Sequence, residues 1–126
     1  MNKPIDQMKH TKTGKQIFKI MTVDLDCCGH DSTAAKQLLY DCIPLFEKVL
    51  KQSIRLYRKQ HKKTVLFPMD PDYFIFDPRF TELQVHLRKQ DYREAGYCLA
   101  KLTLQRWIYI PNICYCILTT LKEFLQ

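Results

Sequence analysis

Glycine is scarce in this chain of 126 residues, which contains only three. Tight hairpin turns and the loops that wrap phosphate groups both depend on glycine. The scarcity argues against a hairpin-rich β fold and against a glycine-loop nucleotide site. Long apolar runs are also missing, since the best stretch, residues 107–121, is interrupted by Pro111 and Asn112 and is too short to cross a bilayer.

The paired cysteines of a zinc knuckle are absent too. No two cysteines have the CxxC spacing, and the first twenty residues are polar and Lys-rich, without the apolar core of a secretory leader. We therefore expect reduced thiols that act as small hydrophobic side chains in a cytoplasmic protein. The six are Cys27, Cys28, Cys42, Cys98, Cys114 and Cys116.

Acidic residues are outnumbered, with 13 Asp and Glu against 20 Lys and Arg, and the net charge of +7 is clustered. Residues 45–63 hold seven cations against Glu47 alone, whereas residues 21–44 and 70–82 are net acidic. The remaining composition, 46% hydrophobic and 26% charged, is typical of one soluble globular domain. A focused stripe of charge attracts and orients a partner, which uniformly spread charge does not.

The basic segment has the period of a helix. At 100° per residue its seven cations fall within an arc of roughly 140°, while Phe46, Val49, Leu50, Ser53 and Tyr57 fall on the other side. This pattern predicts a helix that is apolar inward and cationic outward. Further cations that we expect to reinforce it are Lys9, Lys12, Lys15, Lys19, Arg88, Lys89, Arg93, Lys101 and Arg106.

The rest of the chain predicts an all-α fold, a small bundle of four to five helices with a Pro- and aromatic-rich extended connection. We expect residues 1–14 to be a flexible basic tail and residues 15–126 to be a single helical domain. Residues 15–25 fit either a short helix or a strand. Residues 26–32 form a turn, with Asp31 or Ser32 as the N-cap of a helix over 33–62 that Pro44 kinks or breaks.

Residues 64–80 contain three prolines and are predicted to be extended. Their aromatic side chains, Tyr73, Phe74, Phe76 and Phe80, are expected to pack on the bundle rather than to stack on bases. Helices are then predicted over 81–89, from a capping box at Asp91 and Glu94 to about Trp107, and from Pro111 to Phe124.

One segment has the composition of a metal site. Residues 24–31, DLDCCGHD, contain two thiols, an imidazole and three carboxylates, and Cys98, Cys114 or Cys116 would complete a set through space. However, adjacent cysteines do not readily bind one tetrahedral ion together, so a helix-capping turn is the favoured interpretation. The sequence predicts no metal, no cofactor and no catalytic residue.

Arg55 and His61 form an R-x(5)-H string that resembles the short R-x(4–6)-H signature of the HEPN ribonucleases, which are also helical bundles. The resemblance implies a dimeric ribonuclease in which Arg and His cut RNA, with His as the acid–base group. Six residues place the two side chains about 120° apart around a helix, so a single site is not obvious.

The leading hypothesis is a non-catalytic protein that binds the backbone of RNA or single-stranded DNA. We expect it to act beside protein partners in a larger complex, and we expect no association with a membrane. The overall architecture resembles that of the small helical subunits of CRISPR effector complexes. An adaptor that docks an acidic protein surface is the alternative from another class, and the HEPN-like ribonuclease is the third. The predicted binding residues are Lys48, Lys51, Arg55, Arg58, Lys59, Lys62, Lys63, Arg88 and Lys89.

Overall fold

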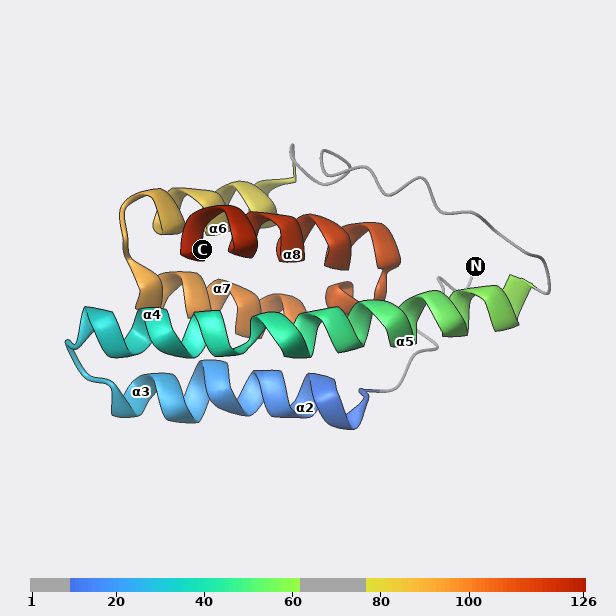
Figure 1. The fold of residues 1–126 in the computed structure, drawn as a ribbon, viewed down its shortest axis with the longest axis horizontal. Coiled ribbons are helices and arrows are strands. Elements are labelled where there is room, and N and C mark those ends of the chain that lie inside the picture. Colours follow the sequence, from blue (N-terminus) through green and yellow to red (C-terminus); the bar gives the residue numbers. More distant parts are fainter. Residues whose placement is uncertain (1–9, 62–76) are drawn as a thin grey trace.

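Helices make up the regular structure of the protein, and no strand occurs in the residues that the structure describes (Figure 1). The computed structural model describes residues 10–61 and 77–126, and of residues 60 and 61 it describes the backbone only. The all-α prediction is confirmed. The elements are α2 (Lys12–Lys19), η1 (Ile20–Asp24), α3 (Leu25–Cys27), α4 (Ser32–Asp41), α5 (Ile43–His61), α6 (Pro78–Arg88), α7 (Tyr92–Leu104), η2 (Trp107–Tyr109) and α8 (Pro111–Leu125).

The first helix begins at Lys12, inside the range that the sequence assigned to a tail. Thr11 is its N-cap, and the Thr11 hydroxyl accepts a hydrogen bond from the Gly14 amide at 3.0 Å. The Thr11 amide in turn donates to the Tyr109 hydroxyl at 3.1 Å, which anchors the start of α2 to η2. Residues 1–9 lie outside the described residues.

The ambiguous segment 15–25 is helical throughout. Ile17, Met21 and Leu25 are fully buried at four-residue steps, and Val23 points to solvent. A π-helical turn, η1, joins α2 to α3, and its wider i→i+5 bonding keeps these three side chains on one side.

The predicted long helix breaks near Pro44, as expected. α4 ends at Asp41, Cys42 is the C-cap, and α5 begins at Ile43, so that Pro44 lies in the first turn, where no backbone donor is needed. Asp31 is the N-cap of α4, because its carboxylate accepts a hydrogen bond from the Ala34 amide at 3.0 Å. α4 and α5 follow one another along one side of the bundle, beside α2 and α3 (Figure 1).

Two helix boundaries and one helix cap in the last third differ from the prediction. α6 begins at Pro78 rather than at residue 81, because Asp77 caps it by accepting from the Arg79 amide at 2.9 Å. α7 does begin after Asp91, but that carboxylate makes no capping hydrogen bond to the helix. α7 ends at Leu104 rather than at about Trp107, because Arg106 adopts a left-handed backbone conformation with φ of 66°.

The core lies where α2, η1, α4, α5, α6, α7 and α8 meet. Its largest fully buried side chains include Tyr109, Phe46, Phe80, Met21 and Leu99. Phe80 therefore packs inward, in agreement with the prediction for the aromatic segment, while Tyr73, Phe74 and Phe76 lie outside the described residues. Among the helices that the structure describes, none is long and apolar enough to span a membrane.

Candidate functional site

The basic residues of α5 form an exposed row. Of the seven cations predicted to form this row, the structure describes the side chains of five, and every one of them is exposed to solvent. Lys62 and Lys63 lie outside the described residues. We call the five described residues the cationic face: Lys48, Lys51, Arg55, Arg58 and Lys59.

Packing of the opposite side of α5 orients this face. Ile43, Phe46, Val49 and Ser53 are buried, and the Ser53 hydroxyl donates to the Leu50 carbonyl at 2.9 Å, which satisfies the only polar group of that strip. At 100° per residue the five cations span roughly 100°, centred opposite the buried strip. The core contacts of α5 therefore hold its cations outward.

The last turns of α5 extend past the rest of the bundle (Figure 1). The burial pattern agrees, because Leu56 is 37% exposed although it lies on the same side of α5 as the buried Val49. Arg55, Arg58 and Lys59 are also exposed there, whereas Tyr57 is half-buried.

Four of the five cations of this face have no carboxylate partner in the described part of the chain. None of the ion pairs within the described residues involves Lys48, Lys51, Arg55 or Lys59. Glu47, the single acidic residue of α5, is partly buried and is not among the partners of those four cations. The middle of the face has a hollow of about 420 Å³, lined by Lys51, Ile54, Arg55 and Arg58.

Arg88 and Lys89 are exposed but lie elsewhere. They end α6 at the turn into α7, whereas the cationic face runs toward the other end of the bundle (Figure 1). The structure therefore does not bring these two predicted site residues together with α5. The side chain of His61, the acid–base group of the ribonuclease hypothesis, lies outside the description.

Arg93, expected to reinforce the basic surface, is instead held internally. Its guanidinium donates to the Gly29 carbonyl at 3.0 Å and to the Tyr97 hydroxyl at 3.0 Å, and it pairs with Asp26 at 3.4 Å. The Tyr97 hydroxyl also donates to Asp26. Arg93 fastens the turn between α3 and α4 to α7, so its charge is partly cancelled.

The DLDCCGHD segment begins at the end of η1, includes α3 and ends in that turn, so residues 26 and 27 are helical although the sequence predicted a turn over 26–32. The polar groups of the segment have structural roles. The Cys28 thiol donates to the Asp24 carbonyl at 3.5 Å, Asp31 caps α4, and Cys27 is exposed. Its potential ligands do not converge, because within the described residues only one other group of side chains has metal-ligand geometry. The favoured interpretation of this segment, a helix-capping turn, agrees with these contacts.

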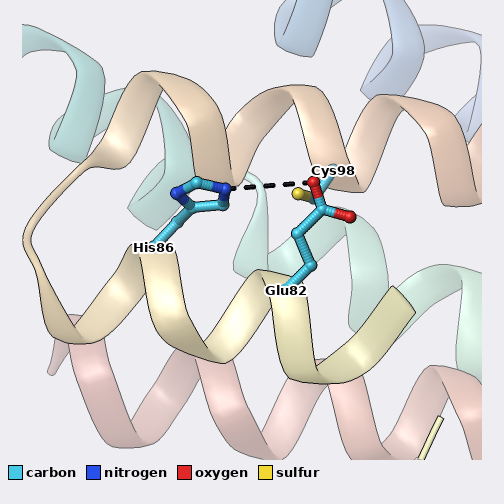
Figure 2. Close-up of side chains that lie close together, drawn as sticks. All are labelled: Glu82, His86 and Cys98. Atoms are coloured by element: carbon cyan, nitrogen blue, oxygen red, sulfur yellow. Dashed lines mark ion pairs between the residues drawn. The ribbon is translucent and has the colours of Figure 1, made fainter. Parts of the chain in front are cut away.

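The group that does converge is Glu82, His86 and Cys98, which the sequence did not indicate. Glu82 and His86 lie one turn apart on α6, and Cys98 faces them from α7 (Figure 2). Their potential ligand atoms all lie within 4.8 Å of one another, and His86 Nε2 is 4.0 Å from Glu82 Oε1. Burial, with the nearby Glu82 carboxylate, raises the pKa of the Cys98 thiol to about 12.

Only the i, i+4 spacing of Glu82 and His86 was visible in the sequence. Cys98 is twelve residues further along the chain from His86, on another helix, and nothing in its local pattern distinguishes it from the buried cysteines. The α6–α7 packing creates the group.

No family model, no curated protein and no solved structure matches this chain. Function has to be argued from the chain's own geometry.

Proposed function

We propose that this protein binds the phosphate backbone of a nucleic acid through the cationic face of α5, without catalysing a reaction on it. The observation that supports this proposal most directly is the exposure of five cations in one row, four of them without a carboxylate partner in the described residues. Cations that are not neutralised internally retain their full attraction for a polyanion.

The length of the face fits a short run of phosphates. Lys48 and Lys59 are eleven residues apart, which on an α-helix corresponds to about 16 Å along the axis. One strand of B-form DNA has a phosphate every 3.4 Å or so along the helix axis, and about five phosphates therefore fit within this length. The five described cations of the face thus match the number of phosphates that fit along it.

The composition of the face favours backbone contact over base reading. It has Lys and Arg but no Asn or Gln among its exposed described residues, and amide side chains are the usual readers of adenine. Arg55 and Arg58 can each hold a phosphate with two parallel N–H donors. We expect little preference for base sequence.

The direct test is fluorescence anisotropy with short labelled RNA, single-stranded DNA and duplex DNA of mixed sequence. The test variant is Lys51→Gln/Lys59→Gln. The matched control is Lys36→Gln/Lys122→Gln, which removes the same charge from exposed positions on α4 and α8. Because counterions are released, the binding constant falls with salt concentration raised to a power of about 0.7 to 0.9 per phosphate contacted. Loss of two contacts is therefore expected to lower affinity by roughly 25- to 60-fold at 0.1 M salt.

Failure has two distinct forms. Absence of binding at low salt to all three nucleic acids contradicts the proposal, and so does an equal loss of affinity in the test and control variants. If Arg55→Glu/Arg58→Glu abolishes binding to a purified acidic protein while no nucleic acid binds, the adaptor alternative replaces it. If RNA is cleaved and His61→Ala stops cleavage while Lys59→Ala does not, the ribonuclease alternative does.

A further inference from the structure

We propose that Glu82, His86 and Cys98 form a binding site for a transition-metal dication, with Zn²⁺ as the best match. The three side chains come from two helices and present one carboxylate oxygen, one imidazole nitrogen and one sulfur toward a common point (Figure 2). This site is separate from the cationic face, and its test does not depend on nucleic-acid binding.

The spacing of the three atoms is close to what a tetrahedral ion requires. Metal–ligand distances of about 2.0 to 2.3 Å place neighbouring ligand atoms about 3.4 to 3.6 Å apart. In the structure they lie within 4.8 Å of one another, and the imidazole and carboxylate atoms are 4.0 Å apart. Binding of an ion would require these atoms to move closer together, and the side chains of Glu82 and His86 have rotatable bonds for such a movement.

The chemistry of the donors selects the class of metal. A mixed set of sulfur, imidazole and carboxylate suits Zn²⁺, whereas Mg²⁺ and Ca²⁺ prefer oxygen alone. The side chain of Glu82 is 55% exposed and that of His86 is 23% exposed, so the group borders on solvent. Three protein ligands with one position left for water form the open type of zinc site.

Asp91 lies behind the imidazole, at a separation too long for a hydrogen bond. Its Oδ2 atom is 3.8 Å from His86 Nδ1, the nitrogen on the other side of the ring from Glu82. Nδ1 is buried and has no hydrogen-bond partner within the described residues, and the Asp91 carboxylate does not cap α7. A carboxylate that accepts from one imidazole nitrogen while the other binds a metal is the common arrangement at zinc sites.

A bound ion would cross-link α6 and α7, which already pack against each other and are joined by a short turn. Because a ligand that binds only the folded state stabilises it, Zn²⁺ at about a hundredfold above its Kd is expected to raise the melting temperature by roughly 10 °C. The effect reports the site independently of any activity.

The test uses the full-length, reduced protein and adds Co²⁺, which occupies zinc sites and has visible absorption. We expect a near-ultraviolet band from thiolate-to-Co²⁺ charge transfer, strong d–d bands typical of tetrahedral geometry, and loss of both on addition of Zn²⁺. Cys98→Ser removes the charge-transfer band. Glu82→Gln, at an exposed position where folding is not at risk, lowers Zn²⁺ affinity at least tenfold.

The matched control is Cys27→Ser/His30→Gln, which removes a thiol and an imidazole from the turn that the sequence singled out. This variant is expected to bind Co²⁺ and Zn²⁺ as the wild type does. The proposal is wrong if no thiolate band develops. It is equally wrong if the control variant loses the band while Cys98→Ser and Glu82→Gln retain it, because the metal then binds at the turn between α3 and α4.

Discussion

Gly14 allows a close contact between α2 and the side chain of Tyr109 in η2. A methyl group at this position would overlap the hydroxyl of Tyr109 and lie 2.9 Å from its Cζ atom. The Tyr109 side chain is 1% exposed, and its hydroxyl accepts from the Thr11 amide at 3.1 Å. The ring therefore has little freedom to move aside.

We expect Gly14→Ala to destabilise the protein, although alanine favours a helix by about 1 kcal/mol over glycine. Overpacking a buried contact costs roughly 1 to 3 kcal/mol, so the net loss is about 1 kcal/mol, or about 4 °C in melting temperature. Thermal unfolding followed by circular dichroism measures it. A melting temperature above that of the wild type would contradict this account of the contact.

Tyr109→Phe is the control for that prediction, because it removes the hydroxyl that an added methyl group would meet. Gly14→Ala should cost less in the Tyr109→Phe background than in the wild type. A double-mutant cycle measures the difference directly. If the two substitutions are strictly additive, the destabilisation has another origin.

At the scale of one element, the start of α6 combines a helix cap with an ion pair. The Asp77 carboxylate accepts from the Arg79 amide at 2.9 Å and pairs with the Arg79 guanidinium at 2.5 Å. The guanidinium lies 3.7 Å above the ring of Trp107. The hydrogen bond from the Arg79 side chain lowers the pKa of Asp77 below its usual 3.8.

The sign of the pH dependence follows from that shift. The folded state binds a proton at Asp77 less readily than the unfolded chain, so the ionised carboxylate stabilises the fold above about pH 4. This stabilisation is lost as the pH falls through the folded-state pKa. We therefore expect the melting temperatures of wild type and Asp77→Asn to differ by a constant amount between pH 5 and 7 and to converge at lower pH.

Asp77→Ala separates the cap from the charge, since alanine provides neither. Loss of an N-cap costs about 1 kcal/mol, and this part of the loss is expected to persist at low pH. Thermal unfolding of the three proteins across the pH range is the measurement. A gap between wild type and Asp77→Asn that widens on acidification would show that the carboxylate does not act as described.

The elements show which sequence signals were sufficient. Pro44, Asp31 and Pro111 marked the break and the helix starts that the structure has, because each acts through its own backbone or the adjacent turn. The start of α6 was placed too late because the three prolines of residues 64–80 were taken to keep the whole segment extended. The end of α7 was placed too late because periodic apolar residues do not reveal the left-handed backbone of Arg106.

At the scale of the whole molecule, some of the described cations lie beside carboxylates and others do not. Around the turns that precede α4 and α7, Arg93 and His86 face Asp26, Glu82 and Asp91. Four cations of the α5 face have no such partner in the described residues. Within the described residues, α5 therefore has a row of exposed cations whose charge no carboxylate cancels at four of the five positions.

The salt dependence of nucleic-acid binding tests whether the cationic face contacts phosphates. If all five cations of the face contact phosphates, a plot of log K against log salt has a slope of about −3.5 for single strands and −4.5 for duplex DNA. Lys51→Gln/Lys59→Gln should reduce the magnitude of this slope by about 1.4 to 1.8. Anisotropy titrations at several salt concentrations provide the slope.

Arg88→Gln/Lys89→Gln is the informative comparison, because these residues were predicted to bind but lie at the other end of the bundle. With an oligonucleotide only long enough for the cationic face, their removal should leave the slope unchanged. A reduction as large as that of Lys51→Gln/Lys59→Gln would show that the ligand contacts the α6–α7 turn instead.

The sequence by itself determined the helical class, most helix boundaries and the two-sided character of α5, because helical periodicity, caps and proline act over one or two turns of chain. Tertiary packing decided the rest. It tied up Arg93, separated Arg88 and Lys89 from α5, and brought Cys98 to Glu82 and His86. Those relations join residues on different elements, and no local spacing encodes which helix faces come together.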